Sequence, residues 1–176
     1  IDRLNAALQE CFNPHDSSLN EWKSGHRIFR ENDKILQLKN QVDDGVYNGD
    51  IGLLVEVIPA NEDFNSQSRL IVDFDGVFAE YTSENLSNIT HAYCISVHKS
   101  QGSEYPIVIL PIVNEATFML QRRLIYTAVS RAKKSLVLLG NKELFVKAVL
   151  KEEKQLRHTT LKQRMLKMNN ERIFPL

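Results

Sequence analysis

The chain has 176 residues, of which 43% are hydrophobic and 25% charged, proportions that are typical of a globular protein. Basic and acidic side chains are equal in number, 22 of each. No apolar run approaches the roughly 20 residues needed to cross a bilayer, and no signal peptide is visible, which argues against a membrane or secreted protein.

The charge is unevenly distributed along the chain. Residues 1–90 hold 7 basic and 16 acidic side chains, a net charge of −9, whereas residues 91–176 hold 15 and 6, a net charge of +9. A basic half is typical of a surface that faces a polyanion, and equally of solvated basic helices. The two cysteines, Cys11 and Cys94, form no CxxC pair, so we expect a reducing, cytoplasmic setting in which both are small buried residues.

The N-terminal segment predicts a helix followed by a loop. Apolar residues recur at helical spacing between Leu4 and Cys11, and Pro14 follows them, so residues 2–12 are predicted to form an amphipathic helix. Residues 13–32 are polar and are expected to be looped.

From Asp33 onward the sequence consists of short apolar, β-branched runs that are separated by turn-forming residues. Four strands are predicted, over residues 34–38, 51–58, 69–74 and 77–82. Asp75-Gly76 is a tight-turn signal between the last two, and residues 59–68 form a polar turn. Four strands in about 55 residues predict a small β-barrel or curled sheet inserted within a larger fold.

From His91 onward the pattern is that of an α/β fold. The expected elements are a strand or short helix over 92–104, a strand over 107–113, a helix over 119–132, a strand over 135–139 and a helix capped by Asn141 that runs to about Leu150. The continuous apolar run Ile107–Val113 is typical of a strand buried on both faces. This alternation predicts a parallel sheet, while the basic residues 151–176 fit either a terminal helix or a partly disordered tail.

A glycine loop is the first segment whose residues indicate chemistry. Phosphate-binding loops need glycine because the backbone approaches the anion closely, often with positive φ. Around Gly102, Lys99 adds charge, and hydrogen-bonding groups come from His98, Ser100, Gln101, Ser103 and Glu104. The same composition also fits a polar surface turn.

Arg131 and the turn Tyr47-Asn48-Gly49-Asp50 are the other two candidates. A guanidinium at the end of an apolar helix can fork onto a phosphate and stabilise charge on a transferring γ-phosphoryl group, or simply be a favourable charge at a helix C-terminus. Asn48 and the backbone N–H groups of the Asn48-Gly49 tip can contact a nucleic-acid phosphate, or the segment is a hairpin turn and nothing more. None of the seven glycines is followed by lysine, so the chain contains no Walker-type phosphate loop.

Together these segments resemble a known family. Val97-His98-Lys99-Ser100-Gln101-Gly102-Ser103-Glu104 and Tyr126-Thr127-Ala128-Val129-Ser130-Arg131-Ala132 resemble motifs V and VI of superfamily 1 helicases. The similarity is strongest to the RecD-like branch, the exodeoxyribonuclease V alpha-subunit family. Val46-Tyr47-Asn48-Gly49-Asp50-Ile51-Gly52 resembles the Asn-Gly turn of that family's inserted SH3-like domain, and the helix from Leu4 resembles the one that opens its second motor domain.

The resemblance implies an α/β fold: a RecA-like second motor domain that carries an inserted SH3-like β-barrel. The motor domain would comprise residues 1–32 and 89–152, the barrel residues 33–88, and a basic tail residues 153–176. Enzymes of this family are ATP-driven helicases that move 5′ to 3′ on single-stranded DNA and act in recombination and repair. Their N-terminal motor domain carries the Walker motifs, which this chain lacks, and the Mg²⁺ ligands are expected there.

The resemblance also assigns roles to residues. Arg131 would be the catalytic arginine, and Gln101, Gly102 and Glu104 would join it in binding ATP. His98, Lys99, Ser100, Asn48 and Gly49 would bind DNA. Expected partners are single-stranded DNA, the N-terminal motor domain and other subunits of a nuclease-helicase complex, with no membrane.

The same residues leave alternatives open. A Dda-like helicase and the motor of a plasmid-mobilisation relaxase share these motifs, and a standalone DNA-binding module without a motor is a different class. The chain on its own is predicted to be inactive as an ATPase.

Overall fold

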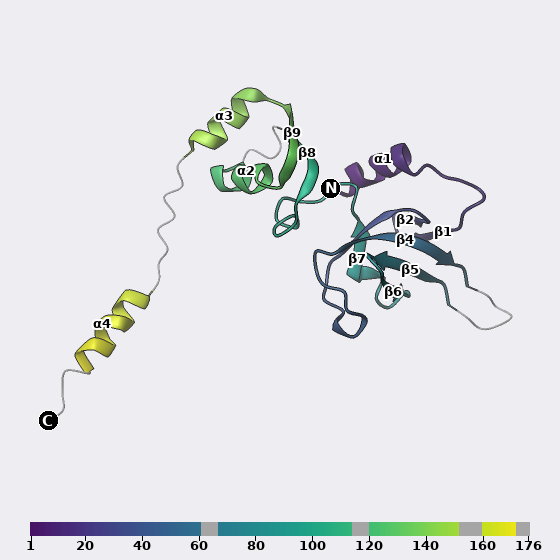
Figure 1. Ribbon diagram of the computed structural model, residues 1–176, viewed down its shortest axis with the longest axis horizontal. Helices are drawn as coiled ribbons and strands as arrows, with labels where there is room; N and C mark the ends of the chain where they lie inside the picture. The colour runs from purple at the N-terminus through teal and green to yellow at the C-terminus, as the bar shows by residue number, and fades with distance from the viewer. Residues whose placement is uncertain (61–66, 114–119, 152–159, 172–176) are drawn as a thin grey trace.

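The structure is a computed structural model that describes residues 1–60, 67–113, 120–151 and 160–171. A five-stranded antiparallel sheet and a parallel pair of strands with two helices form its two packed parts, and Figure 1 shows them side by side. The terminal helix α4 (Leu161–Glu171) lies apart from both (Figure 1). No helix in the described ranges is long and apolar enough to span a bilayer.

The first element, α1 (Asp2–Phe12), confirms the predicted helix but not its expected apolar face. Its buried side chains are Asn5 and Gln9, whereas Leu4 is 42% exposed and Cys11 is exposed. The amide side chains of Asn5 and Gln9 form hydrogen bonds with backbone carbonyls and with the Asp33 carboxylate. The buried face of the helix is therefore the amide face and not the face on which the apolar residues recur. The expected burial of Cys11 is therefore wrong.

A β-hairpin occupies part of the segment expected to be looped. β1 (Glu21–Ser24) pairs antiparallel with β2 (Arg27–Arg30). Gly25 adopts a positive φ of 59° in the connecting turn, a conformation that glycine allows at low cost. Trp22 lies opposite Phe29, and both pack against the core of the large sheet.

The predicted small β-barrel or curled sheet forms as a five-stranded antiparallel sheet, called the barrel below, with one strand more than the sequence indicated. In the order β6-β5-β4-β3-β7, the sheet contains β3 (Lys34–Gln37), β4 (Ile51–Ile58), β5 (Arg69–Phe74), β6 (Val77–Tyr81) and the unpredicted β7 (Ile89–His91). The short 3-10 helices η1 (Val42–Asp44) and η3 (Leu86–Asn88) lie in its connections. The predicted turn over 59–68 falls largely outside the described residues.

One apolar core holds this sheet together. Its buried members come from all five strands, the hairpin and the loops: Phe29, Ile35, Val46, Leu54, Val57, Leu70, Val72, Phe74, Ala79, Tyr81, Leu86 and Ile89. Along β5 buried and half-buried residues alternate after the exposed Arg69, as expected for a strand with one face on the core. A register shift between Leu54 and Glu56 in β4 bends the sheet locally.

The second part confirms the parallel α/β arrangement. β8 (Tyr105–Ile112) pairs parallel with β9 (Ala132–Gly140), and α2 (Arg122–Val129) connects them. The expected start of α2, at residue 119, lies outside the described residues. Residues 92–104 form bends and turns rather than the expected strand or short helix.

The helix after β9 begins where the sequence indicated. The side chain of Asn141 accepts hydrogen bonds from the N–H groups of Glu143 and Leu144, at 2.8 and 3.1 Å, and α3 (Lys142–Leu150) follows. This cap satisfies backbone donors that the first helical turn otherwise leaves unpaired.

Helices cover only one face of the β8–β9 pair. Buried Ile112, Ile125 and Ala148 form the core between strands and helices. On the other face Ile107 and Ile109 are each 61% exposed. The expectation of a strand buried on both faces is therefore wrong for this chain, because no second layer from its described residues packs on that face.

Candidate functional site

The segment around Gly102 is a coil of successive turns. Backbone N–H groups of Lys99 and Ser100 donate to the carbonyl of Ser96, at 3.0 and 3.1 Å, and the Ser103 N–H donates to Ser100 at 3.2 Å. Gly102 has a φ of 88°, which side chains with a Cβ rarely adopt. A Cβ at this position would meet nothing within 4 Å, so glycine is required by the backbone conformation rather than by crowding.

The side chains of this loop differ in what they offer to a ligand. His98, Gln101 and Glu104 are exposed. Ser100 is only 6% exposed, and its hydroxyl donates to the Val97 carbonyl at 2.8 Å, so it stabilises the loop from within. Glu104 forms an exposed ion pair with Lys133, at 3.1 Å.

Arg131 lies two residues beyond the end of α2 and is attached to the same loop. Its Nη1 donates to the Ser103 carbonyl at 2.9 Å, and its Nε donates to Thr127 at 3.2 Å. The third contact is from Nη2 to the Ser130 hydroxyl, at 3.2 Å. A guanidinium has five N–H donors, so these contacts leave one N–H on each terminal nitrogen.

Backbone contacts fix the same junction. The Tyr105 N–H donates to the Arg131 carbonyl at 2.8 Å, at the point where β8 begins beside β9. The structure therefore brings together Arg131 and the loop that contains Gly102, although 28 residues separate Arg131 from Ser103. None of the arginine's hydrogen bonds within the described residues goes to a carboxylate.

In the turn Tyr47–Asp50, which has Asn48-Gly49 at its tip, the backbone N–H groups already donate hydrogen bonds within the chain. The N–H groups of Tyr47 and Asn48 donate to the side chains of Asp50 and Asn40, at 2.7 and 2.9 Å. Those of Gly49 and Asp50 donate to backbone carbonyls, at 2.9 and 3.0 Å. What the turn presents is therefore its side chains rather than its amides.

A side-chain hydrogen bond connects this turn to the glycine loop. The Lys99 ammonium donates to Asn48 Oδ1 at 2.9 Å, across 51 residues of sequence. The glycine loop thus runs between two contacts, with the barrel turn near its start and Arg131 near its end. Two groups of predicted site residues are joined in this way, while His98 and Gln101 have no side-chain hydrogen bond within the described part of the chain.

A buried polar cluster, which sequence reasoning did not identify, supports the arrangement. The fully buried Asp33 accepts hydrogen bonds from Gln9 at 2.7 Å, Asn13 at 2.8 Å and Tyr93 at 2.9 Å. Burial of the Tyr93 hydroxyl raises its pKa, and the neighbouring Asp33 carboxylate raises it further. The amide side chains at positions 5, 9 and 13, four residues apart, were the sequence signal for this polar face.

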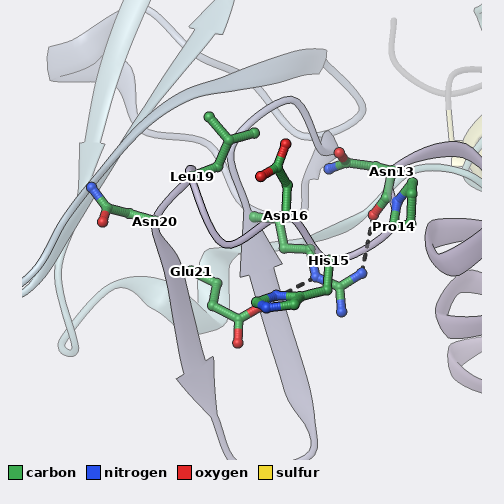
Figure 2. A pocket seen from close by; sticks show the side chains of 8 residues that line it. Asn13, Pro14, His15, Asp16, Leu19, Asn20 and Glu21 are labelled. Carbon is green, nitrogen blue, oxygen red and sulfur yellow. Dashed lines mark hydrogen bonds and ion pairs between the residues drawn. The ribbon is translucent and has the colours of Figure 1, made fainter.

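A small pocket among the described residues is too small for a nucleotide. It lies between the end of α1 and the β1–β2 hairpin, and Figure 2 shows Asn13, His15 and Glu21 among its lining side chains. Its volume of about 10 Å³ accommodates no more than a single water molecule. His15 contacts Glu21 at 3.1 Å, and the Arg30 guanidinium donates to the Asn13 carbonyl at 3.0 Å, so these groups bind one another.

Two family models match consecutive parts of the chain. A model described as the ATP-dependent RecD-like DNA helicase SH3 domain matches residues 4–74. A second, the UvrD-like helicase C-terminal domain, matches residues 91–139. The first match contains most of α1, the hairpin and strands β3 to β5, and the second contains β8, α2 and most of β9.

Curated relatives and a solved structure agree with these models. The chain is 32% identical over 166 residues to the ATP-dependent RecD2 DNA helicase of Deinococcus radiodurans, covering 94% of this chain and 21% of that protein. It is 32% identical over 110 residues to the RecBCD enzyme subunit RecD of Buchnera aphidicola, covering 61% of this chain and 17% of that protein. The chain thus spans about a fifth of the length of these relatives.

A structure of Pif1 helicases at forked double-stranded DNA has the same fold. The TM-score is 0.57 at 19% sequence identity, with 95% of this chain and 41% of that chain covered. With the two domain matches and the RecD relatives, this shows an α/β helicase fold with an SH3-like barrel. The chain belongs to the RecD-like helicases of superfamily 1, of which it is a C-terminal part.

Proposed function

We propose that this chain is the part of an ATP-dependent 5′-3′ DNA helicase that supplies motif V and the motif VI arginine to an ATP site shared with an N-terminal motor domain. In this proposal residues 1–32 and 89–152 form the second motor domain, residues 33–88 the inserted barrel and residues 153–176 a basic tail. The relative from Deinococcus radiodurans, an ATP-dependent DNA helicase by name, supports the reaction.

One observation carries the ATP part of the proposal. Arg131 is attached to the carbonyl of Ser103, next to Gly102 and Glu104, and keeps one N–H on each terminal nitrogen. A guanidinium in this position can fork onto the γ-phosphate of an ATP molecule that the other domain holds. Charge develops on that phosphate during transfer, and a fixed arginine stabilises it.

The remaining residues of the loop complete the proposed nucleotide side. Gln101 and Glu104 are exposed on the same turns as Gly102, where the Gln101 amide can donate to a phosphate oxygen and the Glu104 carboxylate can accept from a ribose hydroxyl. No three metal-ligating side chains are grouped among the described residues. In this proposal, as in the family that the chain resembles, the Mg²⁺ that accompanies ATP is bound by ligands of the N-terminal domain.

The proposed DNA side lies where the loop meets the barrel. His98, Lys99 and Ser100 belong to the loop, and Asn48 and Gly49 to the turn that Lys99 contacts. Because Ser100 is buried and Gly49 donates its N–H to Gln37, we assign the direct phosphate contacts to His98 and Lys99. ATP-driven closure of the two domains would then move these contacts along single-stranded DNA.

The cellular setting follows from the relatives by analogy. The Buchnera aphidicola relative is by name a subunit of the RecBCD enzyme, which supports a role in recombination or repair and other subunits of a nuclease-helicase complex as partners. A cytoplasmic location accords with this setting and is part of the proposal.

The experiment that tests the proposal compares the printed chain with the longer protein that contains it. We expect the chain alone to bind single-stranded oligonucleotides weakly and to hydrolyse no ATP, because the phosphate-binding loop of Walker type is absent from it. The longer protein should hydrolyse ATP and be stimulated by DNA. A DNA-stimulated ATPase activity in the printed chain would refute the shared site.

A further inference from the structure

The hydrogen bond between Lys99 and Asn48 joins the barrel to the glycine loop. The bond is 2.9 Å long and links segments 51 residues apart. All four backbone N–H groups of the Tyr47–Asp50 turn are donated within the chain, so the turn has no amide left for a phosphate. Its effect on a nucleic acid must therefore come through side chains.

We infer that Asn48 is a positioning residue: it holds the Lys99 ammonium at the junction of barrel and loop, where this ammonium binds one phosphodiester of single-stranded DNA. The inference rests on the proposed function and goes beyond it, because Asn48 then acts through Lys99 rather than on DNA. An ammonium has three N–H donors, and the contact with Asn48 uses one of them. Two donors and the full positive charge are left for the phosphate.

The chemistry of the acceptor supports this role. An amide oxygen is neutral, so it orients the ammonium without cancelling its charge, whereas a carboxylate would compete with the phosphate for it. Lysine has a long, flexible side chain, and ordering it before DNA arrives reduces the entropy lost on binding. Asn48 thus provides orientation at no electrostatic cost to the site.

The turn that contains Asn48 is held in place by hydrogen bonds to the rest of the barrel. The Asn48 N–H donates to Asn40, and the next N–H donates to the carbonyl of the fully buried Gln37. The side-chain oxygen of Gln37 accepts a hydrogen bond from Tyr81 at 2.7 Å. A displacement of Lys99 by DNA would therefore be transmitted to a well-packed part of the barrel.

A double-mutant cycle on the full 176-residue chain tests the inference. Binding of a fluorescent oligo(dT) is measured by anisotropy at several salt concentrations for Asn48→Ala, Lys99→Gln and the double variant. We expect each single change to weaken binding about fivefold at low salt, and the double variant to be no weaker than Lys99→Gln. The slope of log affinity against log salt should fall by about 0.7 with Lys99→Gln.

Two further variants keep the result interpretable. Asn48→Asp retains the size and the acceptor of the side chain, and it should weaken binding more than Asn48→Ala because a carboxylate neutralises Lys99. Lys23→Gln, at the exposed position of strand β1, removes the same charge elsewhere and should change binding less than twofold. Thermal unfolding of each variant, followed by circular dichroism, checks that the barrel is folded.

The possible failures are distinguishable. Additive effects in the double variant, or an Asn48→Ala variant that binds like the original chain, would overturn the positioning role while leaving DNA binding by Lys99 intact. If Lys99→Gln weakens binding no more than Lys23→Gln, or if the chain binds no oligonucleotide at low salt, the DNA-binding part of the proposed function fails as well.

Discussion

The buried carboxylate of Asp33 shows how a single residue holds several elements together. Besides the three side-chain hydrogen bonds described above, it accepts the Arg30 N–H at 2.7 Å and lies 3.2 Å from the Nε2 of His91. That nitrogen also faces the Ile28 carbonyl at 3.0 Å, and two acceptors around one nitrogen imply that it carries the proton. The Asp33 carboxylate thus contacts helix α1, the hairpin and β7 at the same time.

The hydrogen bonds decide the ionisation of this group. Burial by itself raises the pKa of Asp33, but hydrogen bonds from His91, the Arg30 N–H and Asn13 outweigh it and hold the pKa below the usual 3.8. A carboxyl group with a lowered pKa in the folded state stabilises the fold above its unfolded pKa. That stabilisation is lost as the pH falls through the folded value.

We predict that Asp33→Asn lowers the free energy of unfolding by about 3 kcal/mol at neutral pH, because an amide leaves several buried donors unpaired. The variant should also lose less stability than the original chain between neutral pH and pH 3. Urea unfolding followed by circular dichroism across this range provides the measurement. Asp43→Asn, at an exposed position, is the control, and an equal loss of stability in both variants would remove Asp33 from this role.

At the scale of elements, the β8–β9 pair has an apolar face without a covering layer. Ile109 lies in register with Val137, and Pro111 with Leu139, and the exposed fractions are 61% for Ile109, 41% for Val137 and 52% for Leu139. Parallel strands in proteins are normally covered on both faces. The chain spans about a fifth of its relatives, and in the proposed helicase the remainder of the protein is the expected cover.

Hydrogen exchange can test whether the longer protein covers this face. We predict that backbone amides of β8 exchange more slowly in the longer protein than in the printed chain, because burial and added strands suppress local opening. Amides of β4 and β5 serve as an internal control and should exchange equally in the two proteins. Equal exchange of β8 in both would contradict the assignment.

Particular elements show what the sequence predicts and where its information ends. The strands β4, β5 and β6 follow from β-branched runs and the Asp75-Gly76 turn, and the α3 cap follows from Asn141, because each depends on local chemistry. The hairpin β1–β2 was missed because its four-residue strands alternate too briefly to show a period. Its stability comes from packing against a distant core.

The candidate site also combines features that local sequence predicts with contacts that only the fold determines. The glycine loop and Arg131 were identified as separate motifs, but their contact through the Ser103 carbonyl depends on the parallel pairing of β8 and β9. The buried face of α1 was misjudged because its partner is a carboxylate rather than an apolar core. No periodicity encodes a partner 20 or more residues away.

At the scale of the whole molecule, the uneven distribution of charge and the position of the candidate site point to the same half of the chain. The basic half of the chain contains both Lys99 and Arg131, while the half that contains the barrel is acidic, so the two cations of the candidate site belong to a basic surface. A phosphate-rich ligand is attracted to such a surface, and its binding should weaken with salt. The loop contacts the barrel turn through Lys99 and Arg131 through the Ser103 carbonyl, so it lies between the proposed DNA contact and the proposed nucleotide contact.

The central claim is that Arg131 completes an ATP site held by another domain, and the most direct test is DNA-stimulated ATP hydrolysis by the longer protein. We predict that Arg131→Ala and Arg131→Lys each lower kcat by about a thousandfold while affinity for single-stranded DNA changes little. The neighbouring Lys134→Gln removes an exposed charge and should leave kcat near its original value. An Arg131→Ala protein that is folded and still hydrolyses ATP at a rate close to the original would contradict the account.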